Sequence, residues 1–272
     1  MDVFTAIIAA MAAILPIAPE AKEAPVAAVP QGVWTIRADN DLCGLSHDYS
    51  TPNGLVTIGF TPTPTQDDLE VVTLGPARGM SAASSGHATM ILSPSGRVVV
   101  GSFRSFLLPG PGKQRATIIR ADRAIFDGLP AATELRIEAN SFVVYPLRNT
   151  NGAVFALKDC EQSLMRKWGI DMAEFAKAKI PPKGLNPAGW FSSDDYPTTA
   201  LRSGVGGRTV MLVGVSETGK VLSCRPVISS RNIDLDQASC RIVKNRGKFQ
   251  PASDATGHGL ASWAILAVRW LR

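Results

Sequence analysis

Side chains that could carry nucleophilic or metal chemistry are few in this sequence and widely spaced. The three histidines, His47, His87 and His258, lie far from one another, and no acidic cluster completes a metal-binding set. Ser84, Ser85 and His87 could pair a nucleophile with a base, but neighbouring residues on a strand point to opposite faces. We therefore expect no catalytic residue and no metal site.

The acidic pairs and the glycine-rich turn also fall short of known site patterns. Gly110, Gly112 and Lys113 match a phosphate-binding loop only in part, because Leu107 and Gln114 stand where that loop needs Gly and Ser or Thr. Three pairs of carboxylates lie in expected loops as ordinary solvated turn residues: Asp39 and Asp41, Asp67 and Asp68, and Asp194 and Asp195. We expect no cofactor.

Length and composition limit the classes of protein that this chain can be. Its 272 residues indicate two domains or one large one, with a substantial core. Hydrophobic residues make up 45% and charged residues 19%, which excludes a disordered tail protein. No apolar run reaches the roughly 18 residues of a membrane-spanning helix, which excludes a multi-span transporter. The net charge of +5 does not argue for nucleic acid as a partner.

An uncharged apolar run, VFTAIIAAMAAIL at residues 3–15, opens the chain and is followed by a stretch rich in Ala, Pro and Glu. An apolar core of this length, then small residues and Pro, is typical of a secretory signal peptide. We therefore expect residues 1–24 to direct export. Because no Lys or Arg precedes the run, an uncleaved membrane anchor is the alternative.

Four cysteines, Cys43, Cys160, Cys224 and Cys240, lack the short spacing of metal or thioredoxin-type sites. In an oxidising compartment their even number favours two disulfides, with Cys43–Cys160 and Cys224–Cys240 as the natural pairing. The second bridge would close a loop of about 17 residues and contribute roughly 3 kcal/mol. Four buried free thiols are the alternative in the cytosol.

The N-terminal domain, expected at residues 25–180, has the pattern of a β-rich fold. Short apolar segments alternate with turn residues and predict strands at 33–37, 55–60, 69–74, 88–92, 97–108, 116–121, 134–139 and 141–147. Pro94, Ser95 and Gly96 predict a hairpin turn. We expect an antiparallel sandwich or open barrel. A helix at 152–168 follows, since Val154 and Leu157 share an apolar face with Cys160.

The C-terminal domain, expected at residues 190–272, follows a short helix near Asp171 and a Pro/Gly-rich linker at 181–189. Pro197 opens a short helix, residues 210–215 and 221–227 form two strands, and 235–243 form a second helix. Residues 262–271 end the chain as a strand in which Leu266, Val268 and Trp270 share one face. The whole chain is thus predicted to be α+β.

An ordered series of short motifs in this domain resembles the C-terminal domain of the TonB family. The series runs through Asp195-Tyr196-Pro197, Ala200-Leu201, Gly207-Arg208, Gly219-Lys220-Val221, Ser229-Ser230, Leu235-Asp236, Phe249 to Ala252 and Arg269-Trp270. Cys224 and Cys240 resemble a paired-cysteine branch of the family in bacterial envelope proteins. One departure is Arg231, which stands where the family usually has Gly after the two serines and puts the local turn geometry in question.

The resemblance implies a small periplasmic domain, linked to transmembrane transport, with a short antiparallel sheet and flanking helices. In known members it binds an extended peptide of an outer-membrane receptor along the last strand, by β-strand addition. The matching edge here is Ser262 to Trp270, with Ser262, Trp263, Ile265, Ala267 and Arg269 as the expected binding residues. Ordinary core packing is the alternative role for Trp263, Ile265 and Trp270.

The remainder of the TonB pattern is missing, because the apolar run has no histidine and the linker is too short for a stalk across the periplasm. We therefore expect a non-enzymatic periplasmic adaptor with a protein or peptide partner and no nucleic acid. The alternative is an envelope enzyme with its catalytic site in the β-rich domain. A further expectation is a dimer formed through the C-terminal edge strand.

Overall fold

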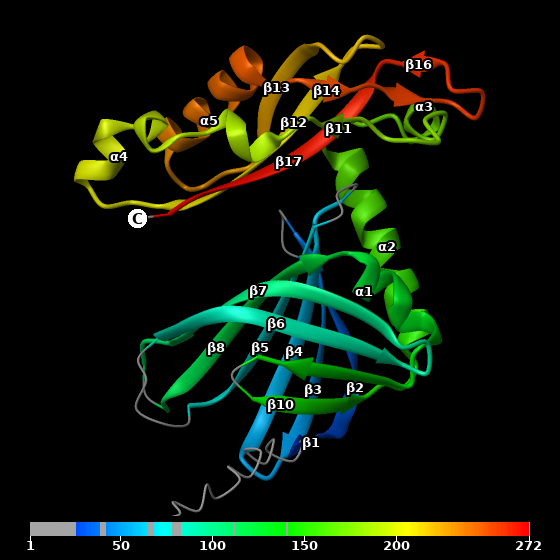
Figure 1. Ribbon diagram of the computed structural model, residues 1–272, viewed down its shortest axis with the longest axis vertical. Coiled ribbons are helices and arrows are strands. Elements are labelled where there is room, and N and C mark those ends of the chain that lie inside the picture. The colour runs from blue at the N-terminus through cyan, green and yellow to red at the C-terminus, as the bar shows by residue number, and fades with distance from the viewer. Residues whose placement is uncertain are drawn as a thin grey trace, which may run out of the picture.

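The computed structural model describes residues 26–38, 42–64, 68–77, 83–110, 112–139 and 141–271 (Figure 1). The expected signal peptide at residues 1–24 lies outside the described residues. The chain is α+β, as predicted, with a large β-rich body formed by the N-terminal part and a smaller mixed body formed by the C-terminal part (Figure 1).

The N-terminal body is one ten-stranded sheet in the order β1-β10-β9-β6-β7-β8-β5-β4-β3-β2. The strands are β1 (Val26–Ala27), β2 (Val29–Ala38), β3 (Cys43–Thr51), β4 (Gly54–Pro62), β5 (Asp68–Pro76), β6 (Ala83–Ser93), β7 (Arg97–Leu107), β8 (Gln114–Asp122), β9 (Glu134–Glu138) and β10 (Phe142–Pro146).

This sheet nearly closes on itself, which decides between the two predicted architectures in favour of a barrel. β1 and β2 are separated by Ala28 alone, and they pair with opposite ends of the sheet. β1 runs parallel to β10, and Ala28 N donates to Val144 O at 3.0 Å, while β2 pairs with β3. Joining the first and last strands in this way removes most of the exposed edge of the sheet.

All eight strands predicted for this domain are present, but the sequence pattern missed the two-residue β1 and the longer β3. The sequence of β3, CGLSHDYST, is polar, yet Cys43, Leu45, His47 and Tyr49 alternate into the interior and are buried. The alternation of apolar and polar residues could not be recognised in the sequence, because a histidine occupies one of the inward-facing positions. His47 is accommodated because its ring lies 4.8 Å from those of Trp34 and Tyr49, and its Nδ1 lies 2.8 Å from Asp48 O.

Helix α2 (Thr150–Lys167) joins the barrel to the C-terminal body (Figure 1). Earlier in the chain, between β8 and β9, α1 (Ala124–Gly128) and the 3-10 turn η1 (Leu129–Ala131) contribute Ile125, Phe126 and Leu129 to the core. The predicted apolar stripe of α2 is buried against the barrel. Cys160 on this face forms the predicted disulfide with Cys43, with an S–S distance of 2.04 Å.

The segment after α2 is not an extended linker, because it packs against the C-terminal strands. It contains α3 (Met172–Phe175), β11 (Lys183–Gly184) and the 3-10 turn η2 (Pro187–Trp190). Asp171 caps α3 by accepting from Ala173 N at 2.8 Å. β11 pairs with β14, and Ile180 bridges to Ser253. The boundary that we place at residues 181–189 stays a prediction.

The C-terminal body is built on a three-stranded antiparallel sheet in the order β13-β12-β17. Its elements are η3 (Ser193–Asp195), α4 (Thr198–Arg202), β12 (Gly207–Val215), β13 (Val221–Ile228), α5 (Ile233–Arg246), β14 (Phe249–Gln250), β15 (Ala252–Ser253), β16 (Gly259–Leu260) and β17 (Ser262–Trp270). The predicted Cys224–Cys240 disulfide joins β13 to α5, with an S–S distance of 2.03 Å.

Both faces of the central strand β12 are covered, in agreement with its almost continuous apolar sequence from Val210 to Val215. One face carries Met211, Val213 and Leu266, which pack with residues of α5. The other face carries Leu212 and Ile265, which belong to the same hydrophobic cluster as the barrel and α2. The C-terminal body is therefore packed onto the N-terminal body.

Candidate functional site

β17 is an edge strand of the C-terminal sheet. It pairs with β12 in continuous antiparallel register from Val215↔Ser262 to Gly207↔Trp270. Among the described residues, no strand pairs with its other side. Every second residue of such a strand directs its N–H and C=O away from its neighbour, so β17 offers a row of backbone groups to an added strand.

The side chains of β17 alternate between two hydrophobic clusters. Ala264, Leu266 and Trp270 pack with α5, which confirms the shared face predicted for Leu266 and Trp270. Trp270 is anchored further, because its Nε1 donates to Ser239 Oγ at 3.0 Å and its ring contacts that of Tyr196 edge-on. These two contacts fix the C-terminal end of β17.

The five residues predicted to bind are not equivalent in the structure. Ile265 is fully buried and Trp263 is half-buried, and both pack against the N-terminal body. Ser262 Oγ is buried and has no hydrogen-bond partner among the described residues. Ala267 is exposed and Arg269 is half-buried, and both line a cavity next to the barrel. β17 also contacts α3. The part of β17 that lines a cavity is its second half, from Leu266 to Arg269.

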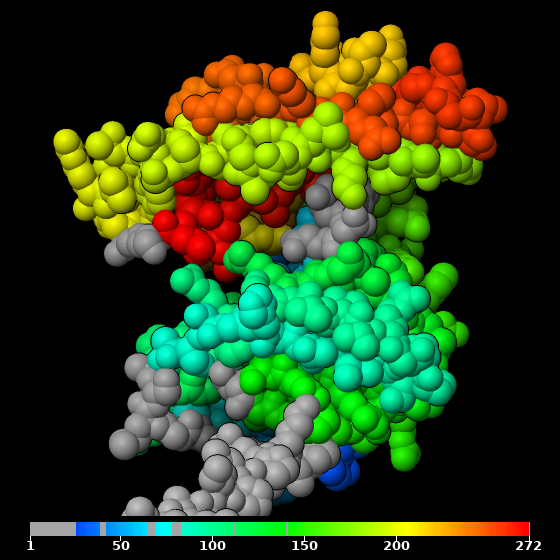
Figure 2. Space-filling model, in the orientation of Figure 1, coloured from blue at the N-terminus to red at the C-terminus, as the bar shows by residue number. Residues whose placement is uncertain are grey.

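A cleft between the two bodies runs along this second half (Figure 2). A cavity of about 230 Å³ is lined by residues 266–269 of β17 together with Thr63, Glu70 and Arg120 of the barrel. A second cavity of about 470 Å³ continues it toward β6 and β7. Both cavities include Arg120 and Arg269 in their lining, so they adjoin each other in the hollow between β17 and the outer wall of the barrel.

Ion pairs and hydrogen bonds join the walls of this cleft. Arg269 Nη2 on β17 lies 2.5 Å from Glu70 Oε1 on β5, and Arg120 Nε lies 3.5 Å from the same oxygen. Arg208 Nη2 on β12 donates to Thr63 Oγ1 at 2.9 Å. Arg225 on β13 donates to the Trp168 carbonyl at the end of α2. Together these contacts hold the two bodies in one orientation.

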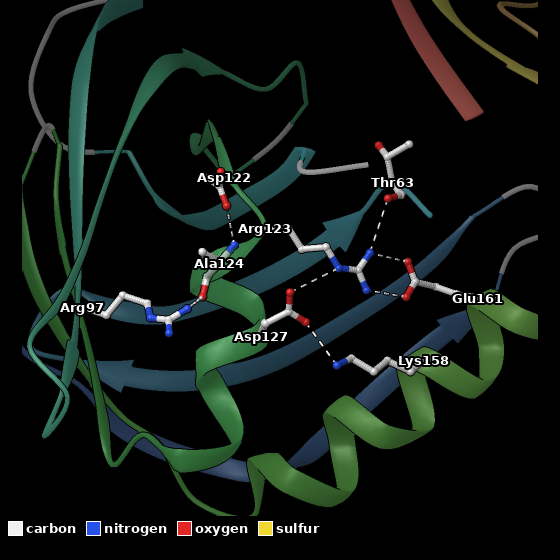
Figure 3. A network of polar contacts seen from close by, with 8 residues as sticks. All are labelled: Thr63, Arg97, Asp122, Arg123, Ala124, Asp127, Lys158 and Glu161. Atoms are coloured by element: carbon white, nitrogen blue, oxygen red, sulfur yellow. Dashed lines mark hydrogen bonds and ion pairs between the residues drawn. The ribbon is translucent and has the colours of Figure 1, made fainter. Parts of the chain in front are cut away.

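The barrel side of this connection is braced by a buried ion pair (Figure 3). Arg123, at the start of α1, donates to both carboxylate oxygens of Glu161 on α2, at 3.0 and 2.8 Å. The same guanidinium donates to Thr63 O at 3.4 Å and lies 3.8 Å from Asp127. Thr63 thus contacts Arg123 through its carbonyl and Arg208 through its hydroxyl, which links the helix brace to the cleft.

The motifs that carried the family resemblance have structural roles. Burial would raise the pKa of Asp236, but hydrogen bonds from Ser229, Ser230 and Thr209 outweigh it and lower that pKa. These bonds tie the start of α5 to the ends of β12 and β13. Likewise, hydrogen bonds from Arg246 lower the pKa of Asp195 to about 2.

Arg231 is the departure from the family pattern, and its backbone has φ of +67°. This left-handed conformation is the one that Gly adopts without strain and other residues rarely adopt. Arg231 therefore occupies a turn position whose backbone conformation suits Gly better than Arg.

The remaining side chains that could take part in catalysis or metal binding lie far apart. His87 is exposed on the outer face of β6, whereas Ser84 belongs to the alternate, inward set of that strand. His258 lies in a turn, where its backbone N–H donates to Asp254. The described residues contain no group of three or more His, Cys, Asp or Glu side chains that could hold a metal ion.

Comparison with known families agrees with this geometry. Residues 193–270 match the family described as the Gram-negative bacterial TonB protein C-terminal, which confirms the resemblance read from the motifs. The C-terminal body is thus a TonB C-terminal domain. This family is non-enzymatic and transport-related, and it implies a periplasmic location and protein partners in the envelope.

The match covers the C-terminal body and leaves the barrel outside it. No curated protein and no solved structure matches the chain. Within the part of the chain that the structure describes, no helix is both long and apolar enough to cross a membrane.

Proposed function

We propose that this chain is a periplasmic adaptor whose C-terminal domain binds an extended peptide of an envelope protein, such as an outer-membrane receptor, by strand addition to β17. The observation that carries the proposal is the unpaired edge of β17 among the described residues, together with the cavities of about 230 and 470 Å³ beside its second half. Main-chain pairing would supply affinity with little demand on the sequence of the peptide.

The fixed position of β17 supports this role energetically. Because its side chains are packed on both faces, the strand does not need to become ordered when a peptide binds. A receptor strand that is already ordered lowers the entropic cost of association and leaves more of the pairing energy as affinity. The other sheet edge, β13, is the natural comparison, since it also pairs only with β12 among the described residues.

The test is a titration of the ¹⁵N-labelled full chain with synthetic peptides, each covering the N-terminal extended segment of one outer-membrane receptor. We expect the amide signals of Leu266 to Leu271 to shift more than those of β13. If no peptide shifts the β17 amides, or if the shifts fall on β13 alone, the proposal is wrong.

A pair of blocking variants makes the test specific. All four native cysteines are in disulfides, so a cysteine introduced by Ala267→Cys can be alkylated selectively with a bulky maleimide. The matched control is Leu222→Cys on β13, where the native side chain is 66% exposed. We expect the adduct at position 267 to weaken peptide binding by about tenfold or more, and the adduct at 222 to leave it unchanged.

The alternative of an envelope enzyme stays a prediction without a specific supporting observation. A cavity of about 380 Å³ opens at one end of the barrel and includes Arg115, Thr117 and Tyr145 in its lining. The described lining residues include no His, Asp or Glu to act as a general acid or base. Dimerisation through β17 would appear in the same titration as concentration-dependent shifts of its amides before peptide is added.

A further inference from the structure

The wall opposite β17 belongs to the barrel, a part of the chain outside the family match. Figure 2 shows the hollow between the two bodies, with the C-terminal strand in red along one side and the barrel strands on the other. A peptide paired with the second half of β17 would lie between these walls. The barrel would then contact the side chains of that peptide, and those contacts could select its sequence.

Two arginines project from the outer face of the barrel into this hollow. Arg120 on β8 is paired with Ser102 on β7, and Arg104 on β7 is paired with Ile118 on β8. These register positions make Arg104 and Arg120 diagonal neighbours on adjacent strands, within joint reach of one ligand group. Arg269 approaches from β17, so guanidinium groups from both walls line the cavity of about 470 Å³.

Among the residues that the structure describes, the positive charge of this cluster is only partly neutralised. Glu70 contacts Arg120 and Arg269 through one carboxylate oxygen, and it thereby balances one of the three cationic charges. Arg104 is exposed and makes no ion pair or hydrogen bond with any described residue. An anionic group that enters the hollow would therefore find one guanidinium without a partner and a second one that is shared.

The neighbours of Arg104 suit a carboxylate attached to an extended chain. Ser85 lies opposite Arg104 on β6, and both Ser85 and Ser102 contribute hydroxyl donors to the lining. Phe106 and Leu271, which are 36% and 50% exposed, add apolar surface at the same cavity. Planar guanidinium groups bind carboxylates through paired hydrogen bonds, and nearby hydroxyls can complete the contacts of the anion.

We infer that the barrel completes the peptide site and that Arg104, together with Arg120 and Arg269, selects an extended peptide with acidic side chains. This inference rests on the proposed strand addition to β17, because that pairing brings the peptide between the two walls. The barrel acts as a specificity wall: the edge of β17 supplies sequence-tolerant affinity, and the arginine cluster supplies discrimination by charge.

The experiment compares two dye-labelled, end-capped nine-residue peptides of alternating Thr and Val, both carrying the same soluble polyethylene glycol tail. In one peptide two Thr residues are replaced by Glu, and in the other the same two are replaced by Gln. Binding to the full-length chain is measured by fluorescence anisotropy. We expect the acidic peptide to bind about five- to tenfold more tightly, and the difference to shrink at high salt.

The matched variants are Arg104→Gln and Arg241→Gln, which remove the same charge from two exposed positions. Arg241 lies on α5, the layer that covers the opposite face of the C-terminal sheet from the barrel. We expect Arg104→Gln to weaken binding of the acidic peptide about fivefold and to leave the Gln peptide unchanged. Arg241→Gln should change neither affinity.

The outcomes separate this inference from the proposed function. If both peptides bind equally and the adduct at position 267 displaces both, strand addition holds and selection by the arginines is wrong. If the acidic peptide binds Arg104→Gln and Arg241→Gln equally well, the inference is also overturned. If neither these peptides nor the receptor peptides bind at β17, both the inference and the proposed function are wrong.

Discussion

Removing the Glu161 carboxylate should destabilise the junction between barrel and helix far more than removing a nearby exposed charge. Glu161 is 5% exposed, and its two oxygens accept from Arg123 at 3.0 and 2.8 Å. Loss of one partner of a buried ion pair typically costs about 3–5 kcal/mol, because the other charge is left without compensation. Arg123 keeps its contacts with Thr63 and Asp127, so we expect about 2–3 kcal/mol for Glu161→Ala.

The matched control is Lys158→Ala, one turn earlier in the same helix (Figure 3). The Lys158–Asp127 pair spans 3.2 Å, but its side chains are 47% and 44% exposed. Exposed pairs of this kind contribute about 0–1 kcal/mol. Lys158→Ala should therefore lower the free energy of unfolding by no more than about 0.5 kcal/mol.

Urea unfolding of the two variants at pH 7 measures this difference. With a denaturant slope near 2–3 kcal/mol per molar, we expect Glu161→Ala to shift the midpoint by about 1 M and Lys158→Ala by about 0.2 M. Glu161→Gln, which keeps the shape and one acceptor oxygen, should lie between them. Equal midpoints for Glu161→Ala and Lys158→Ala would refute the view that the buried pair braces the junction.

Three further changes test other parts of the structure by the same measurement of unfolding free energy. Arg231→Gly should stabilise the protein by about 1 kcal/mol, since Gly relieves the positive φ; a loss of stability would contradict this. Asp236→Asn should cost about 2 kcal/mol at pH 7. Because the folded pKa of Asp236 is lowered, its contribution is present above the ordinary pKa near 4 and is lost as the pH falls through the folded value. The stability cost of Asp236→Asn should therefore decrease as the pH falls below about 4. An undiminished cost at pH 3 would contradict the stabilising role of the charged carboxylate. Replacing Cys224 and Cys240 by Ala should cost about 3 kcal/mol, because the disulfide joins residues 16 positions apart and so restricts the unfolded chain. An unchanged unfolding midpoint would contradict that estimate.

Local patterns in the sequence were sufficient to predict most of the helices and strands. The alternation of apolar residues predicted eight of the barrel strands, and the stripe through Leu157 and Cys160 predicted the covered face of α2. β3 escaped because His47 occupies an inward position, and the aromatic surroundings that make this acceptable come from distant strands. Burial of a polar residue depends on partners that its own segment does not reveal.

The residues predicted to bind a peptide show the same division between what the sequence and the structure reveal. The family resemblance predicts Ser262, Trp263, Ile265, Ala267 and Arg269 as binding residues, and β17 is an edge strand, as that prediction requires. The structure then separates them, because Trp263 and Ile265 pack against the N-terminal body and only Ala267 and Arg269 border the cleft. Arg104 and Arg120 carried no signal of their own in the sequence, since isolated arginines on alternating strands are ordinary surface residues.

The sequence alone determined the strand and helix segments, both disulfide pairs and the TonB-type C-terminal domain, because apolar periodicity, cysteine number and ordered motifs are local or composition-level properties. Closure of the barrel, the cleft beside β17 and the meeting of Arg104, Arg120 and Arg269 were decided by tertiary structure. Glu70 and Arg269, almost two hundred residues apart, form an ion pair only because two separately built sheets pack against each other. Packing between distant segments depends on the shape of whole surfaces, which no single stretch of sequence contains.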